Sequence, residues 1–196
     1  LAGRVGPVTF VAAIATRALA SPLAEVVDLA RLAGSERPDF EEAAETMMSA
    51  VRDEVTGTLG AFEPKERWAM DWYYPTLTGA IDRQAGRARL AEGWDTFVMD
   101  GLGVRCVSDE PWITASETAE ASIAHAAVGQ VDTATELLAS TREHRLASGA
   151  YLTGIVHPER IVFPADEHTS YTAAAVILAV DAIRGDSPAS RLFQHT

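Results

Sequence analysis

The chain has 196 residues, of which 47% are hydrophobic and 22% charged, an ordinary composition for a globular protein with one sizeable core. Its formal net charge is -12 and Lys65 is its only lysine, which disfavours nucleic acid and anionic membrane surfaces as partners, because both require clustered basic side chains. The single cysteine, Cys106, excludes an intrachain disulfide and predicts a reducing, cytoplasmic location, and no apolar run reaches the roughly 18 residues of a spanning helix.

Three helices are predicted in the first third of the chain. Residues 7–20 are mostly apolar, and we interpret them as a core helix because no basic segment precedes them as in a secretion signal. Ser21 and Gly34 are suited to cap the two ends of a second helix at 22–33. Asp39 is suited to cap a third helix, whose apolar stripe and charged opposite face predict an amphipathic outer helix.

Two kinds of helix alternate through the rest of the chain. Helices of the first kind are rich in small or apolar residues and follow loops with acidic and aromatic residues; they are predicted at 75–81, 114–128 and 169–183. Helices of the second kind are amphipathic and are predicted at 84–99 and 132–141. The last helix of the first kind is apolar all round, which predicts burial on every side.

This alternation predicts an all-α chain folded as an α/α toroid. Inner helices of such a ring need small residues because they contact neighbours on both sides, outer helices meet solvent on one face, and the loops before the inner helices converge at one mouth. Pro75 is expected in the first turn of its helix, and short extended pieces are expected at 151–156 and 161–163. We expect a single domain, residues 1–196, with about three to four helical hairpins.

Four segments carry a resemblance to a known family. They are MDWYYPTLTGAI (70–81), GLGVRCVSDEPWITASETAEA (101–121), SGAYLTGIVHPE (148–159) and FPADEHTSYTAAAVILAVDAI (163–183). They resemble the carboxyl-terminal half of a bacterial family of six-hairpin (α/α)6 proteins, often labelled prenyltransferase or squalene-cyclase-like but similar in layout to glucoamylase-type six-hairpin glycosidases. The resemblance covers roughly residues 21–184 and implies the C-terminal part of a longer toroid with a carbohydrate-active site.

Three carboxylates near the starts of inner helices are candidates for catalysis. They are Asp71, Glu110 and Glu117. Glycoside cleavage needs two carboxyl groups, one protonated as the acid and one ionised as the base or nucleophile. The alternative for any single acid is a structural role, because acidic residues at helix N-termini cap the helix and complement its dipole.

Aromatic and polar residues in the same loops are candidates for substrate binding. They are Trp72, Tyr73, Asp109, Trp112, Tyr151, Glu167, His168 and Tyr171. Aromatic faces and hydroxyl groups suit sugar rings, whereas the alternative is packing at the rim of the ring of helices. We expect Asp71, Glu110, Trp112 and Glu167 to line one concave surface, since convergent polar and aromatic groups are typical of a ligand pocket.

A zinc site is the competing interpretation of four residues, Cys106, Asp100, Asp109 and His168. His168 and Tyr171 match a His-Thr-x-Tyr segment of protein prenyltransferase β-subunits, in which the histidine binds zinc beside an Asp-x-Cys pair. That pair is absent, and zinc needs three or four well-placed ligands, so we expect no metal and no cofactor.

The resemblance, together with these residues, implies three alternative functions. The first is a protein of six-hairpin glycosidase type that hydrolyses or binds an oligosaccharide. The others are a prenyltransferase- or terpenoid-cyclase-like protein of the same shape, although neither DxDD nor DDxxD occurs, and a non-catalytic binding module. Because 8–20 and 169–183 are nearly all apolar, we also expect each to expose an apolar face that the missing half of the chain or a second copy covers.

Overall fold

The computed structural model describes residues 66–193, together with six earlier positions. These are Glu42, Thr46, Ser49, Arg52, Asp53 and Gly57, and all of them except Gly57 are helical. The first five lie on the predicted third helix; the helices predicted at 7–20 and 22–33 lie outside the described residues. The chain divides into two compact units, residues 1–64 and 65–196.

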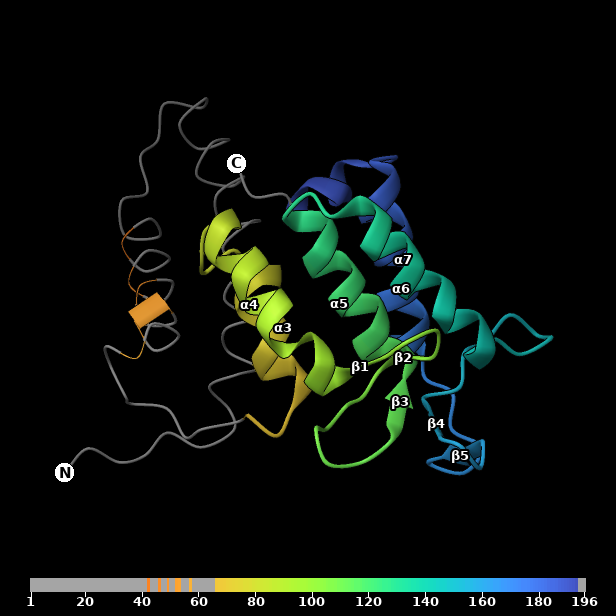
Figure 1. Cartoon of the computed structure of the whole chain (residues 1–196). Coiled ribbons are helices and arrows are strands. Elements are labelled where there is room, and N and C mark those ends of the chain that lie inside the picture. The colour runs from red at the N-terminus through yellow and green to blue at the C-terminus, as the bar shows by residue number, and fades with distance from the viewer. Residues whose placement is uncertain are drawn as a thin grey trace. The chain divides into compact units, whose positions relative to one another are not determined.

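Five α-helices dominate the second unit (Figure 1). They are α3 (Ala69–Leu77), α4 (Arg83–Phe97), α5 (Ala115–Ala127), α6 (Val131–Ser140) and α7 (Ser170–Arg184), with 3-10 helices η1 (Thr141–His144) and η2 (Pro188–Phe193). The bounds of α4 to α7 agree with the prediction within about two residues. None of the described helices combines the length and the apolar character needed to cross a membrane.

Short antiparallel strands accompany the helices, so the all-α prediction was wrong in this respect. The strands are β1 (Val98–Met99), β2 (Gly103–Val104), β3 (Trp112–Thr114), β4 (Gly154–Val156) and β5 (Ile161–Phe163). β1 pairs with β2, and β4 lies between β3 and β5 in a three-stranded sheet. The last two strands match the predicted extended pieces. The described part of the chain is mostly helical with two small sheets, and closure into a toroid stays a prediction.

Helix α5 is the central element of this unit, since it contacts α3, α6 and α7. Its buried residues are nearly all small, namely Ala115, Ser116, Thr118, Ala119, Ala121, Ser122, Ile123, Ala124, His125 and Ala127. Small side chains let neighbouring helices approach closely, and the Ser122 hydroxyl donates to the Ala134 carbonyl of α6 at 2.7 Å. The predicted small-residue inner helix is therefore surrounded by other helices.

Helices α3, α5 and α7 begin at the same end of the unit. The amide of Ala69, at the start of α3, donates to the Cys106 carbonyl in the loop that leads through β3 into α5. The amide of Ala115, at the start of α5, donates to the Thr153 carbonyl. The amide of Thr153 donates in turn to the carbonyl of Glu167, which lies three residues before α7. Figure 1 shows β3, β4 and β5 at this end of the helices. The three loops before the small-residue helices are thus joined by backbone hydrogen bonds.

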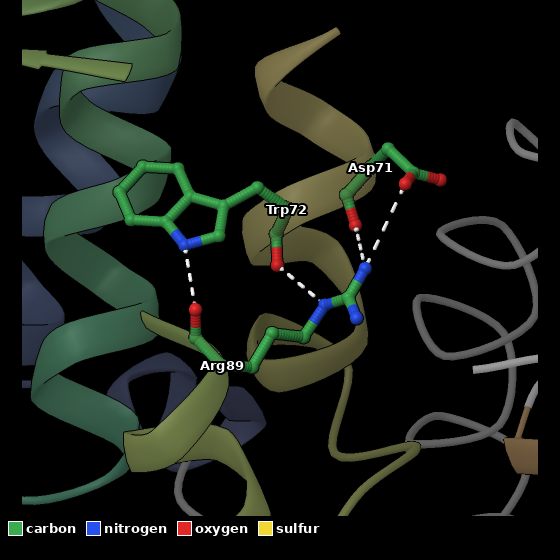
Figure 2. Close-up of polar contacts among 3 residues, drawn as sticks. All are labelled: Asp71, Trp72 and Arg89. Atoms are coloured by element: carbon green, nitrogen blue, oxygen red, sulfur yellow. Dashed lines mark hydrogen bonds and ion pairs between the residues drawn. The ribbon is translucent and has the colours of Figure 1, made fainter. Parts of the chain in front are cut away.

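Helix α3 begins earlier than predicted, and Pro75 lies in its interior rather than in its first turn. Proline has no N–H to donate to the carbonyl four residues earlier, here that of Asp71. Arg89 of α4 donates from Nη2 to this carbonyl at 2.8 Å and from Nε to the Trp72 carbonyl at 2.9 Å, as Figure 2 shows. A side chain from the next helix thus supplies the donor that Pro75 lacks.

Helix α7 is buried on one face only, so the prediction of burial on every side was wrong. Thr172, Ala175, Val176 and Ala179 form its buried face. On the other side Ile177 is 67% and Leu178 36% exposed. This exposed apolar surface is what we expected for an inner helix that lacks one neighbour.

Candidate functional site

Two glutamates and three tyrosines from α3, α5 and α7 form one group, which we call the carboxylate–tyrosine cluster. Its members are Glu117 and Glu120 on α5, Tyr73 and Tyr74 on α3, and Tyr171 on α7. The two glutamates are three residues apart, so they lie on one face of α5. The small residues of α5 allow the flanking helices to bring their tyrosines to this face.

Glu120 lies between two tyrosine hydroxyls. Tyr73 donates from Oη to Glu120 Oε2 at 2.5 Å. Tyr171 donates to the other oxygen, Oε1. Tyr73 is completely buried, whereas Tyr171 is 57% exposed. Glu120 therefore links a buried tyrosine of α3 to an exposed tyrosine of α7.

The surroundings of Glu120 make its carboxyl a weaker acid than usual. Burial raises the pKa of the Glu120 carboxyl, the hydrogen bonds from Tyr171 and Tyr73 oppose this increase, and the nearby charge of Glu117 adds to it. Burial, followed by the negative charge of Glu120, also raises the pKa of the Tyr73, Tyr74 and Tyr171 hydroxyls. The phenols consequently remain protonated donors, and the cluster contains two carboxyl groups in different environments.

Glu117 lies in the first turn of α5, at the end where the three helices begin, and it is partly exposed. The hydroxyl of Ser116 donates to Glu117 Oε2 at 2.6 Å. A partly exposed carboxylate beside a carboxyl with a raised pKa is the kind of pair that acid–base catalysis uses.

Asp71, the first predicted catalytic residue, contacts Arg89 (Figure 2). Arg89 Nη2 lies 3.6 Å from Asp71 Oδ2 and also binds the Asp71 carbonyl. A neighbouring guanidinium favours the ionised carboxylate. The contacts of Asp71 therefore connect α3 to α4.

Trp72 is a core residue in this structure. Its side chain is 4% exposed, its ring stacks on Phe97 at 5.5 Å, and its Nε1 donates to the Arg89 carbonyl at 2.9 Å. A Cβ at Gly93 would lie 2.3 Å from the indole ring, so the ring fits where α4 has no side chain. The buried indole has no face open to a ligand.

The loop before α5 carries three more of the predicted site residues. Glu110 is partly exposed. Asp109 pairs with Arg67 at 3.0 Å, and the hydrogen bond from Arg67 lowers the pKa of the Asp109 carboxyl. The ring of Trp112, in β3, lies 5.3 Å from that of Phe163 in β5. Of these residues, Asp109 has a cationic partner and Trp112 packs within the sheet.

The remaining predicted residues lie in the loops before α7. The backbone of Tyr151 pairs with that of Arg145 in an isolated antiparallel β-bridge. Glu167 Oε1 accepts a hydrogen bond from the Thr153 hydroxyl at 2.9 Å, and His168 is exposed. Among all predicted residues, the structure brings Glu117, Tyr73 and Tyr171 into one cluster. The common concave surface of Asp71, Glu110, Trp112 and Glu167 stays a prediction.

Sequence reasoning missed Glu120 and Tyr74. The signal for Glu120 was present, because Glu117 and Glu120 are separated by three residues on a predicted helix and must share a face. Tyr74 directly follows Tyr73, but which of two adjacent helical residues faces α5 depends on packing.

The residues considered for zinc do not assemble into a metal site. Nowhere among the described residues do three side chains of His, Cys, Asp or Glu group in a way that could hold a metal ion. Cys106 is half-buried, and burial raises the pKa of its thiol to about 11.

A cavity of about 320 Å³ lies apart from the cluster, between the end of α4, the β1–β2 hairpin and α6. Its lining residues are Trp94, Val98, Met99, Asp100, Gly101, Gly103, Glu136, Leu137 and Ser140. None of these belongs to the carboxylate–tyrosine cluster, so the cavity and the cluster are separate features.

Comparison with known proteins gives one informative relative. No protein-family model matches the chain. Over 166 residues, 85% of this chain, the sequence is 39% identical to a protein of Mycolicibacterium hassiacum named MMP endo-(1,4)-3-O-methyl-alpha-D-mannosidase. The match spans 45% of that relative, so the chain corresponds to less than half of its length. The chain is thus a distant homologue of a glycoside hydrolase.

Proposed function

We propose that this chain forms part of a glycoside hydrolase that cleaves an α-(1,4)-linked, 3-O-methylated mannose oligosaccharide at the carboxylate–tyrosine cluster. The observation that carries the proposal is the carboxylate–tyrosine cluster where α3, α5 and α7 begin, with Glu117 in the first turn of α5. The name of the relative supports the substrate class. The acidic and aromatic character of the loops at this end supports a neutral sugar over a diphosphate, which would favour basic residues.

Glu117 is the proposed ionised carboxylate. It is partly exposed, and its charge contributes to the raised pKa of its neighbour Glu120. It would take a proton from the attacking water as the water oxygen bonds to the anomeric carbon. Glu120 already accepts hydrogen bonds from two tyrosine hydroxyls through its two oxygens, so we assign it no contact with the glycan.

Glu110 is the proposed acid. The acid gives its proton to the glycosidic oxygen as the bond from that oxygen to the anomeric carbon breaks. Asp109 is less suited to this role, because the hydrogen bond from Arg67 lowers the pKa of its carboxyl, and Asp71 is paired with Arg89. Glu110 is partly exposed in the loop before α5, which brings it to the end of the unit where Glu117 lies.

Glu117→Gln and Glu110→Gln in the full-length protein test this assignment. With a 3-O-methylated α-(1,4)-mannose oligosaccharide as substrate, each change should lower kcat by about 10²- to 10⁴-fold, the usual contribution of an acid or base. The Glu110 variant should recover on an aryl glycoside with a good leaving group, which needs no protonation. Glu92→Gln, an exposed change on α4, is the matched control. Unchanged kcat in the Glu117 variant would reject the proposal.

A further inference from the structure

The side chain of Tyr171 is held in an unusual way for an exposed residue. It is 57% exposed, yet its hydroxyl is bonded to Glu120, a half-buried residue of α5. A surface tyrosine more often packs its ring and leaves its hydroxyl in water. Here the hydroxyl is anchored inside the cluster, and the ring remains accessible.

The anchor of Tyr171 is itself fixed. Glu120 is on α5, and its second oxygen accepts a hydrogen bond at 2.5 Å from Tyr73, which is completely buried on α3. Tyr74 of α3 interacts with both Glu120 and Tyr171. The position of the Tyr171 ring is therefore set by contacts to two other helices before any ligand arrives, and such preorganisation lowers the cost of binding.

The ring also lies near the proposed catalytic group. Glu117 lies three residues before Glu120 on the same face of α5, and Glu120 accepts the hydrogen bond from the Tyr171 hydroxyl. Tyr171 lies in the first turn of α7 and Glu117 in the first turn of α5, at the end where these helices start together. A glycan in contact with Glu117 would therefore meet the exposed ring of Tyr171.

The chemistry of the ring indicates which sugars it would select. Because the Tyr171 hydroxyl is bonded to Glu120, the accessible part of the side chain is the apolar ring. An apolar surface gains from contact with a methyl ether and leaves a free sugar hydroxyl without a partner. The ring should therefore favour an O-methylated sugar over the same sugar without the methyl group.

We propose that Tyr171 is a specificity-determining residue, whose ring contacts the methyl ether of a 3-O-methylated mannose unit, and that Glu120 and Tyr73 are positioning residues that fix this ring. This inference rests on the proposed function and deepens it. Burying one methyl-sized group favours binding by about fourfold. Tyr171 should therefore contribute about fourfold to the preference for the methylated glycan.

The test compares kcat/KM for methylated and unmethylated α-(1,4)-mannose oligosaccharides of equal length in the full-length protein. Tyr171→Leu should lower the methylated-to-unmethylated ratio about fourfold through KM, whereas Tyr171→Phe, which retains the ring, should lower it less. Glu120→Gln should lower the ratio in the same direction as Tyr171→Leu, because the amide group alters the hydrogen bonds that fix the ring. A merely structural role would change both glycans equally and leave the ratio constant.

The outcomes separate the two proposals. Hydrolysis of neither glycan by the unmodified protein would overturn the proposed function and this inference with it. An active protein whose ratio is the same in Tyr171→Leu would overturn the inference alone. If Tyr171→Leu fails to fold, as judged by its melting temperature, the Glu120→Gln ratio decides: a lower ratio supports the inference, and an unchanged ratio overturns it.

Discussion

The acidic side chains of this unit differ in the partners that their carboxyl oxygens bind. Glu120 accepts from two phenols that belong to different helices, and its burial is partly offset by these bonds. Asp71 and Asp109, by contrast, have arginine partners. Acidic residues at one end of a helical unit can therefore have different roles, which their spacing in the sequence does not separate.

His144 provides a prediction at this scale, because it is 1% exposed and its Nε2 lies 3.3 Å from the Ile113 carbonyl. Burial lowers the pKa of the imidazole, and the hydrogen bond with the Ile113 carbonyl and the charge of Glu143 only partly oppose this decrease. The unfolded chain, with an ordinary histidine pKa of about 6.5, then binds a proton more readily than the folded chain. The contribution of neutral His144 to the free energy of unfolding is therefore fully present above about pH 6.5 and is lost as the pH falls below that value.

Denaturant unfolding between about pH 5 and pH 8 measures this dependence. The free energy of unfolding should decrease with falling pH, and His144→Gln should make the decrease shallower. His125, whose pKa burial also lowers, should account for part of the remaining slope. His168→Gln, at an exposed position, should leave the slope unchanged. An equal slope in the His144 and His168 variants would show that His144 is not responsible.

At the scale of elements, the helix pattern was predictable where local signals decide it. The caps and periodicity around α4 to α7 placed these helices within about two residues. The short strands β1, β2 and β3 were missed because two or three paired residues leave no periodic signal. The start of α3 was missed because proline usually marks the first turn of a helix, and only the tertiary contact from Arg89 makes an internal Pro75 tolerable.

The contact between α3 and α4 gives a prediction at this scale. Arg89→Met removes the donor to the Asp71 carbonyl and should lower the free energy of unfolding by about 1–3 kcal/mol, the effect of leaving a buried polar group unsatisfied. Pro75→Ala restores a backbone N–H four residues after Asp71. In a double-mutant cycle measured by denaturant unfolding, Pro75→Ala should therefore recover part of the loss.

Arg87→Met is the matched control for this cycle. Arg87 Nε donates at 2.8 Å to the Val128 carbonyl, which follows α5 and is not the carbonyl that lacks a donor because of Pro75. Pro75→Ala should combine additively with Arg87→Met. Additive behaviour with Arg89→Met as well would show that Arg89 does not replace the donor missing at Pro75.

At the scale of the whole molecule, the resemblance implied a longer, carbohydrate-active protein, and the relative named as a mannosidase is longer than this chain and shares 166 aligned residues with it. The location of the candidate site followed from the alternation of helices, because the loops before small-residue helices meet at one end. The membership of the cluster did not follow, because it depends on which faces of α3 and α7 turn toward α5. Trp72, adjacent to Tyr73, shows this: it is buried against α4 and does not contact Glu120.

The exposed face of α7 gives a prediction about assembly. Ile177 and Leu178 form an apolar surface that we expect a longer chain or a second copy to cover. In analytical ultracentrifugation, the 196-residue chain alone should therefore associate as its concentration rises, and Ile177→Glu should weaken this association. Ile161→Glu, at a 59% exposed position in β5, is the control and should have little effect. A monomer at every concentration would contradict the expectation.

The most direct measurement is the crystal structure of the full-length Glu117→Gln variant soaked with a 3-O-methylated α-(1,4)-mannose oligosaccharide. The account predicts a glycan bound where α3, α5 and α7 begin, with a methyl ether against the ring of Tyr171 and an anomeric carbon beside residue 117. A glycan bound only in the separate cavity lined by Trp94 and Leu137, with the carboxylate–tyrosine cluster free of ligand, would contradict it.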